Sequence, residues 1–145
     1  MDITGPIILV DDDEDDHNIF TDVCTGLGVE NNKLQFFYNG LEFLNFLRAT
    51  NVVPFVIFCD INMPGVDGLS LRAKINEDEK LRRQSIPFIF FSTAATESQI
   101  EKAYDLTVQG FFIKGVSFEE TKRMIKHILV YWAECKHPNT HKKSR

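Results

Sequence analysis

The sequence predicts an α/β fold in which one parallel β-sheet is covered by helices on both faces. Five short apolar runs, rich in β-branched and aromatic residues, lie at 7–10, 34–38, 55–59, 88–91 and 111–113. Such runs between turn residues are typical of buried strands. Each is followed by apolar residues at helical spacing, and this alternation favours a parallel sheet with right-handed crossovers. We therefore expect a three-layer, doubly wound sheet of five strands with five helices.

Length and composition indicate one globular domain. The chain has 145 residues, of which 43% are hydrophobic, and a net charge of −5, which disfavours a disordered chain or a basic nucleic-acid-binding protein. We expect a domain over residues 1–136 and a polar, flexible tail over residues 137–145. No apolar run approaches the roughly 18 residues of a membrane span, and the amino end lacks a signal-peptide pattern. These features, together with three cysteines that lack metal-ligand spacing, predict a cytoplasmic protein with reduced thiols at Cys24, Cys59 and Cys135.

The first strand, at 7–10, ends in six acidic residues at 11–16. Asp15 or Asp16 is expected to begin the first helix, because carboxylates are favoured beside the unpaired N–H groups of a helix start. A run of acids alone is usually a solvated helix start. This run directly follows a buried strand, however, so its first two members are candidates for a metal site.

The second and third strands are each bounded by recognisable turn residues. Asn39, with Glu42 three residues later, has the pattern of a capping box and predicts a helix start. Pro54 fits only at the beginning of a strand. The third strand stops at Asp60 and passes into the Pro/Gly-rich turn at 61–68.

The segment that precedes the fourth strand is long and charged. It spans Asn76 to Ser85, and the sequence assigns it no role. The fourth strand ends at hydroxyl groups, and Thr96 with Gln99 then forms a capping-box pattern for another helix. Gly110 is expected to end that helix.

The fifth strand, at 111–113, ends at Lys114. Ser117 and Glu120 form a further capping-box pattern. The helix that follows carries an apolar stripe as far as Trp132, which we expect to face the core.

Side chains that carry chemistry gather where the strands end, since parallel strands share one carboxyl edge. They are Asp11, Asp12, Asp60, Ser92 and Lys114. Three adjacent carboxylates repel one another, so a divalent cation is expected between them, and an all-oxygen shell favours Mg²⁺ or Mn²⁺. The lysine is expected to pair with Asp60 at rest and with added negative charge later, while the serine can donate to a phosphoryl oxygen. These are the parts needed for phosphoryl transfer to a carboxylate.

The same residues resemble the response-regulator receiver family from Ile7 to about Trp132. The resemblance is carried by the acidic pair, the block Asp-Ile-Asn-Met-Pro-Gly-Val-Asp-Gly at 60–68, the hydroxyl after the fourth strand and the lysine after the fifth. It implies the flavodoxin-like strand order 2-1-3-4-5, phosphorylation of Asp60 by a phosphohistidine, and dependence on Mg²⁺.

The resemblance also implies a metal-binding role for three residues. Asp12 resembles the direct metal ligand of the family, and Asp11 resembles the carboxylate that acts largely through a metal-bound water. Asn62 stands where the family binds the metal through a backbone carbonyl.

Two further positions resemble the switch residues of the family. The switch hydroxyl lies five residues after the proline that begins the fourth strand, which from Pro87 selects Ser92, with Thr93 as the alternative. Phe111 occupies the position of an aromatic side chain that rotates on activation, although core packing alone would also explain it.

One departure from the family concerns the residue after the lysine. The family usually has a proline in a cis peptide there, whereas this chain has Gly115. A cis bond to a non-proline residue costs about 2.5–4 kcal/mol, which favours a trans Lys114–Gly115 bond with a rearranged loop, but the sequence alone leaves both forms open.

Simpler interpretations apply to several other residues. Asp13 to Asp16 are expected to be surface and capping residues, and the histidines are expected to lie on the surface or in helices: His17, His127, His137 and His141. An aspartyl-phosphate phosphohydrolase would need an acid two residues after the nucleophile, where this chain has Asn62. An FMN carrier of the flavodoxin type is disfavoured because the acids after the first strand would repel its phosphate.

The residues and the resemblance together predict a stand-alone bacterial signalling phosphoacceptor. It would not be an enzyme beyond its own phosphorylation and autodephosphorylation. Its expected partners are a sensor histidine kinase or a histidine phosphotransfer protein and a downstream protein, without nucleic acid. A relay role, in which the phosphoryl group passes onward, is the alternative, and the expected state is a monomer or a weak phosphorylation-dependent dimer.

Overall fold

The computed structural model describes residues 1–138, so most of the predicted tail, residues 139–145, lies outside the described residues. The elements in chain order are β1 (Ile7–Val10), α1 (Glu14–Gly26), the 3₁₀ helix η1 (Asn31–Lys33), β2 (Leu34–Phe37), α2 (Gly40–Ala49), β3 (Val56–Cys59), α3 (Gly68–Asn76), α4 (Glu79–Gln84), β4 (Phe88–Ser92), α5 (Glu97–Asp105), β5 (Gly110–Ile113) and α6 (Phe118–Glu134). No helix in this part of the chain is long and apolar enough to cross a membrane.

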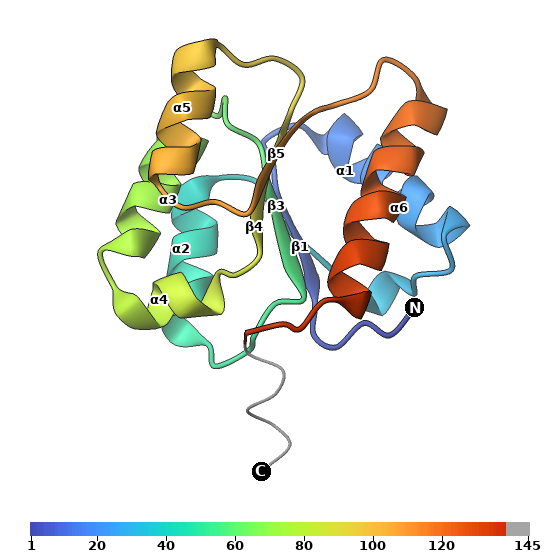
Figure 1. The fold of residues 1–145 in the computed structure, drawn as a ribbon, viewed down its shortest axis with the longest axis horizontal. Helices are drawn as coiled ribbons and strands as arrows, with labels where there is room; N and C mark the ends of the chain where they lie inside the picture. The colour runs from blue at the N-terminus through green and yellow to red at the C-terminus, as the bar shows by residue number, and fades with distance from the viewer. Residues whose placement is uncertain (139–145) are drawn as a thin grey trace.

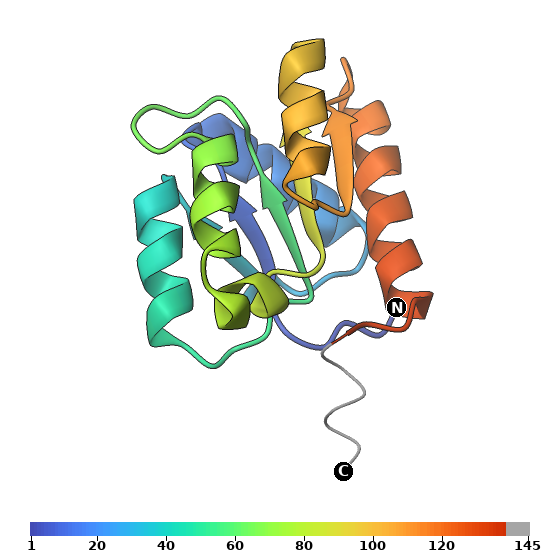
Figure 2. The same ribbon diagram turned by 60° about the vertical axis from the view of Figure 1, so that its left-hand side comes forward.

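The five strands are parallel and lie in the order β2-β1-β3-β4-β5, which confirms the predicted fold class. Helices α1 and α6 cover one face of the sheet, and α2 to α5 lie on the other (Figure 1). The arrows of β1, β3 and β5 point toward the end opposite to the N-terminus (Figure 2), and β2 and β4 run parallel to them. Residues that follow the strands therefore meet at one edge of the sheet.

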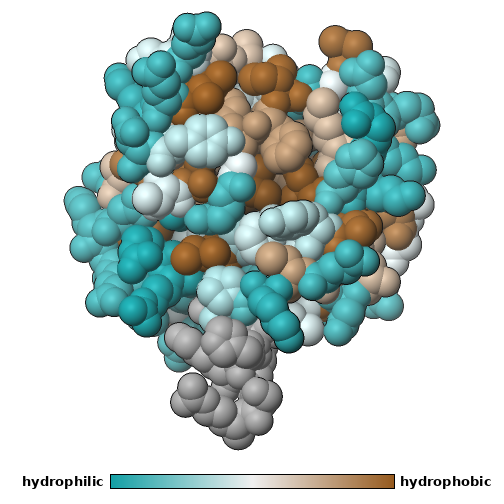
Figure 3. Space-filling view, in the orientation of Figure 1, coloured by the Kyte–Doolittle hydropathy of each residue, from teal (hydrophilic) through white to brown (hydrophobic). Residues whose placement is uncertain are grey.

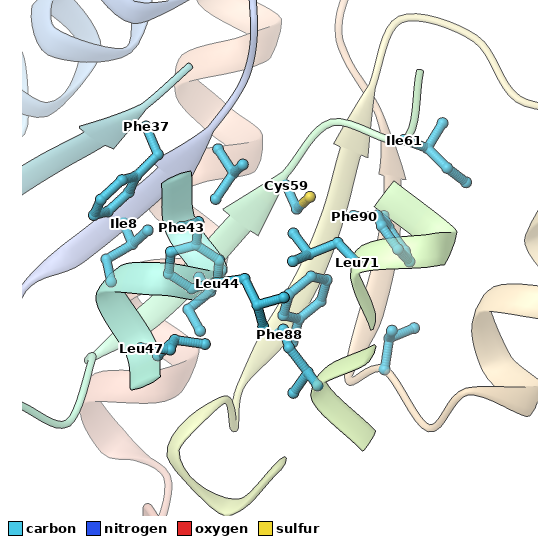
Figure 4. Close-up of a cluster of buried hydrophobic side chains, with 14 of the residues drawn as sticks. Ile8, Phe37, Phe43, Leu44, Leu47, Cys59, Ile61, Leu71, Phe88 and Phe90 are labelled. Atoms are coloured by element: carbon cyan, nitrogen blue, oxygen red, sulfur yellow. The ribbon is translucent and has the colours of Figure 1, made fainter. Parts of the chain in front are cut away.

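The strands are buried because apolar side chains pack on both of their faces. Ile8 and Val10 belong to the core beside α2 and α3, part of which Figure 4 shows, whereas Ile7 and Leu9 belong to the core beside α1 and α6. This alternation follows from the two-residue period of a strand. Phenylalanine rings belong to both cores. Because both faces of the sheet are covered, the strands are continuous apolar runs in the sequence.

Three predicted helix starts carry side-chain caps. The Asn39 side chain accepts from the Glu42 N–H, and Thr96 with Gln99 makes both hydrogen bonds of a capping box. Ser117 accepts from the Glu120 N–H. The first helix begins earlier than expected, because Asp13 caps it instead of Asp15 or Asp16.

The charged segment forms an element that the sequence did not predict. Residues Glu79–Gln84 make the short helix α4, with Asp78 as its cap, so residues 1–138 hold six α-helices where five were expected. The boundary before β5 also differs. Helix α5 ends at Asp105, and Gly110 is the first residue of β5 and not the end of a helix.

Arg72 lies beneath α4 and is almost fully buried. It is 1% exposed, and its guanidinium donates to the carbonyl oxygens of Ser85, Leu106 and Thr107, each at 3.1 Å. Burial, and then the nearby charge of Arg82, lowers its pKa to about 10. Three carbonyls at the ends of α4 and α5 are thus satisfied by one side chain of α3.

His137 does not behave as a residue of a flexible tail. Its imidazole is 8% exposed, and Nε2 hydrogen-bonds to the carbonyl oxygen of Phe55 at 3.0 Å. The expectation of a surface histidine is wrong here, because the ring fills the space between Phe55 and Trp132. Ordered packing thus extends past residue 136.

Candidate functional site

Three carboxylates meet at the carboxyl edge of the sheet, as predicted. Carboxylate oxygens of Asp11, Asp12 and Asp60 lie within 4.8 Å of one another. The register explains this, because Val10 pairs with Cys59 and the next residue on each strand is an aspartate. The N–H of Asp60 donates to the carbonyl oxygen of Val10 at 2.9 Å, which fixes the two strand ends together.

Asp11 is the buried member of this cluster, with 0% exposure. Burial raises its pKa to about 7, although Lys114 and the N–H of Asp13 act in the opposite direction. A buried carboxylate with a raised pKa is relieved by a cation beside it. The all-oxygen cluster therefore fits a hard divalent ion of the Mg²⁺ class.

Ser92, the last residue of β4, is buried, and its Oγ donates a hydrogen bond to Oδ1 of Asp60. Thr93 is exposed. The structure thus brings Ser92, and not the alternative Thr93, to the carboxylate. The N–H of Asn62 also donates to Asp60 Oδ1, at 3.3 Å.

Lys114 lies at the same edge but does not have the expected resting partner. Its ammonium pairs with Oδ2 of Asp11 at 3.0 Å and with Oδ2 of Asp16 at 2.9 Å, and Asp60 is not among its ion-pair partners in the described residues. Burial alone would lower the pKa of Lys114, but Asp11 and Asp16 outweigh burial and raise it. The expected rest pair with Asp60 is therefore wrong for this state.

Asp16 is a site residue that sequence reasoning missed. The sequence indicates only a surface or capping acid here, yet Asp16 stands in the first turn of α1, three residues after the cap Asp13. That position turns its carboxylate toward the end of β5. Had the sequence shown that α1 begins at Glu14, the position of Asp16 in its first turn could have been predicted.

His17 lies in helix α1, one of the two places expected for the histidines, and it is buried there. It is 3% exposed and packs against Phe36 and Tyr38, and its Nε2 hydrogen-bonds to the carbonyl oxygen of Asp11 at 2.7 Å. A carbonyl only accepts, so Nε2 carries a proton. The ring thereby supports the backbone that carries Asp11.

The Lys114–Gly115 bond, which the sequence left open, is trans, since the one cis peptide bond in residues 1–138 is Ile86–Pro87. A Cβ at Gly115 would lie 2.4 Å from Cβ of Glu120. The loop therefore runs so close to the start of α6 that no side chain fits there. This close approach explains why glycine stands at this position.

Asn62 connects the turn after β3 to helix α5. Its amide donates to the carbonyl oxygen of Ala94 at 3.1 Å and accepts from Nε2 of Gln99 at 3.1 Å. Gln99 was predicted only as a capping residue. The metal-binding role of the Asn62 carbonyl stays a prediction.

Phe111 is partly buried and packs against Phe90, with 5.6 Å between the ring centroids. This contact belongs to the core beside α2 and α3. The rotation implied by the family resemblance stays a prediction.

The response regulator receiver domain model matches residues 7–126. The chain belongs to this family. Sequence relatives of this receiver include the probable methanogenesis regulatory protein FilR2 of Methanothrix harundinacea, 29% identical over 69% of this chain and 66% of that protein. Response regulator Rcp1 of Synechocystis is 26% identical over 88% of each chain.

Two solved structures extend these similarities. The phosphorylated cyanobacterial phytochrome response regulator RcpA aligns with a TM-score of 0.78 and 27% identity, covering 90% of this receiver and 94% of that chain. The Mn²⁺-bound form of Rcp1 aligns with a TM-score of 0.78 and 25% identity, covering 92% and 97%. The fold and the family are thus shared with signalling response regulators.

Proposed function

We propose that this receiver takes a phosphoryl group onto Asp60 from the phosphohistidine of a sensor kinase or a phosphotransfer protein. A carboxylate oxygen of Asp60 attacks the phosphorus, the acyl phosphate forms, and the histidine nitrogen keeps the electron pair of the broken P–N bond. The observation that supports this most is the convergence of Ser92 and the Asp11–Asp12 pair on Asp60. Asp60 is thereby the acceptor around which the other groups are arranged.

Each neighbouring group has a role in this transfer. Asp11, Asp12 and Asp60, with the Asn62 carbonyl, would hold Mg²⁺ or Mn²⁺. When bound, that ion would offset the charge gathering on the transferred oxygens. Ser92 turns its hydroxyl from the carboxylate to a phosphoryl oxygen, and the ammonium of Lys114 moves toward the new charge.

The signal would leave through the face formed by α5, β5 and α6. The resemblance to the receiver family implies a surface of the fourth helix, fifth strand and fifth helix of a five-helix fold. These elements are α5, β5 and α6 here, because α4 is an additional helix. Figure 3 shows an apolar hollow between α5 and α6 on this side. Exposed apolar residues of these elements include Tyr104, Ile113, Val130 and Tyr131. We propose that phosphorylation changes the affinity of this face for a partner protein.

The proposal is tested with Mg²⁺ and acetyl phosphate, followed by intact mass measurement. We expect one phosphoryl adduct on the wild-type protein and none on Asp60→Asn or in excess EDTA. An adduct that persists in Asp60→Asn would show that another residue is the acceptor. Steady turnover of added phosphomonoesters would instead favour the phosphohydrolase.

A further inference from the structure

The ammonium of Lys114 is held by two carboxylates of different kinds. Asp11 belongs to the metal cluster and is fully buried, whereas the Asp16 side chain is 25% exposed and lies outside the cluster. The distances are nearly equal, 3.0 and 2.9 Å. The lysine is thus shared between the metal cluster and helix α1.

The Lys114 ammonium and a divalent cation would compete for the carboxylate of Asp11. Both are attracted by the same carboxylate, and they repel each other. With Asp11 engaged by the cation, Asp16 still gives the ammonium a carboxylate. Without Asp16, Lys114 would have to rely on the carboxylates of the cluster.

The surroundings leave room for the ammonium to move. A cavity of about 120 Å³ lies beside it, lined by Asp16, Ile19, Phe91 and Gly115 among others. Gly115 cannot carry a side chain, as its approach to Glu120 shows. Asp11, Asp16 and Lys114 all line this cavity, so the ammonium is not tightly enclosed where it meets its two carboxylates.

We propose that Asp16 is a positioning residue that retains Lys114 on the α1 side of the site and so keeps Asp11 and Asp60 available to the cation. This inference rests on the proposed phosphoacceptor function and adds a residue that regulates the same site. After phosphoryl transfer, the larger charge on Asp60 competes with Asp16 and draws the ammonium across.

The test is a calorimetric Mg²⁺ titration of single and double variants. Asp16→Asn is expected to weaken Mg²⁺ binding about five-fold, because the freed lysine then competes for the cluster. Asp15→Asn is the matched control, since Asp15 is an exposed acid on the same turn and its loss removes the same charge. We expect it to weaken binding less than about two-fold.

The decisive comparison repeats both substitutions in a Lys114→Met background. If Asp16 acts through the lysine, Asp16→Asn should have no greater effect than Asp15→Asn in this background. In the protein that keeps Lys114, Asp16→Glu should retain most of the Mg²⁺ affinity that Asp16→Asn loses. An equal Asp16→Asn effect in both backgrounds would overturn the proposal. Lys114→Gln replaces Lys114→Met if the latter does not fold.

Failure of the proposed function is read separately. If the wild-type protein forms no acetyl-phosphate adduct on Asp60, the phosphoacceptor role is wrong, whatever the Mg²⁺ titrations show. If the adduct forms but the double-variant effects are additive, only the role of Asp16 is wrong.

Discussion

Asp11 resembles a metal-site carboxylate of the family and is fully buried. Burial disfavours the charged form of its carboxylate. Its pKa is about 7 in the folded protein, against an ordinary value of 3.8. Between pH 3.8 and about pH 7, Asp11 therefore keeps its proton in the folded protein but has lost it in the unfolded chain. The stabilisation from this proton is complete below pH about 4 and is lost as the pH rises through about 7.

The pH dependence of stability should show this loss directly. In EDTA, we expect the wild-type free energy of unfolding to fall by roughly 2 kcal/mol relative to Asp11→Asn between pH 5 and pH 8. Thermal or denaturant unfolding at both pH values measures the difference. Asp15→Asn is the control and should follow the wild type. If the free energy of unfolding changed equally between pH 5 and pH 8 in the wild type and in Asp11→Asn, the raised pKa would be contradicted.

The hydroxyl beside Asp60 gives a second prediction at this scale. Ser92→Ala removes a donor aimed at the acceptor carboxylate, so phosphorylation by acetyl phosphate should slow about ten-fold or more. Thr93→Ala is the control because Thr93 is exposed, and its rate should stay within about two-fold of the wild type. Equal losses in both variants would show that Ser92 has no special role.

Residues at strand ends could be predicted from sequence, whereas helix residues beside the site could not. Asp60, Ser92 and Lys114 reach one edge because parallel topology requires it. The contribution of Asp16 and His17 depends on where α1 begins, and shifting a helix start by one residue turns each side chain by about 100°. A run of six acids gives no signal for that start.

At the scale of elements, Arg72 holds three helices together. Arg72→Met should leave the carbonyl groups of Ser85, Leu106 and Thr107 without this donor and lower the free energy of unfolding by about 2–4 kcal/mol. Chemical denaturation measures this loss. Lys80→Met is the matched control, because Lys80 is an exposed residue of the same short helix α4 and its loss should cost less than about 1 kcal/mol.

The sequence was informative about helix starts but not about α4. Asn39, Thr96 and Ser117 cap the predicted helices because their side chains replace missing backbone partners locally. Helix α4 has six residues, too few for a periodic pattern. Its stability depends on tertiary contacts such as those of Arg72, which in sequence looks like one more surface charge.

For the whole molecule, covering both faces of the sheet made the fold class predictable, because every strand became a continuous apolar run.

The proposed response to phosphorylation is also a property of the whole molecule. With Mg²⁺ and acetyl phosphate, we expect amide hydrogen exchange to change in α5, β5 and the start of α6, while α2 keeps its protection. Asp60→Asn should show no change. Changes confined to α2 and α3 would place the output face on the wrong side of the sheet.

The chemistry of the three thiols makes the receiver suitable for single-site labelling. Cys24 and Cys59 are buried, and burial raises their pKa values, to about 12 for Cys24, whereas Cys135 is partly exposed. A maleimide dye at neutral pH should therefore attach mainly to Cys135, which follows α6. Helix α6 ends at the side of the molecule opposite the carboxyl ends of the strands (Figure 2). Such a dye would report partner binding by fluorescence anisotropy while leaving the acceptor edge free for the phosphodonor.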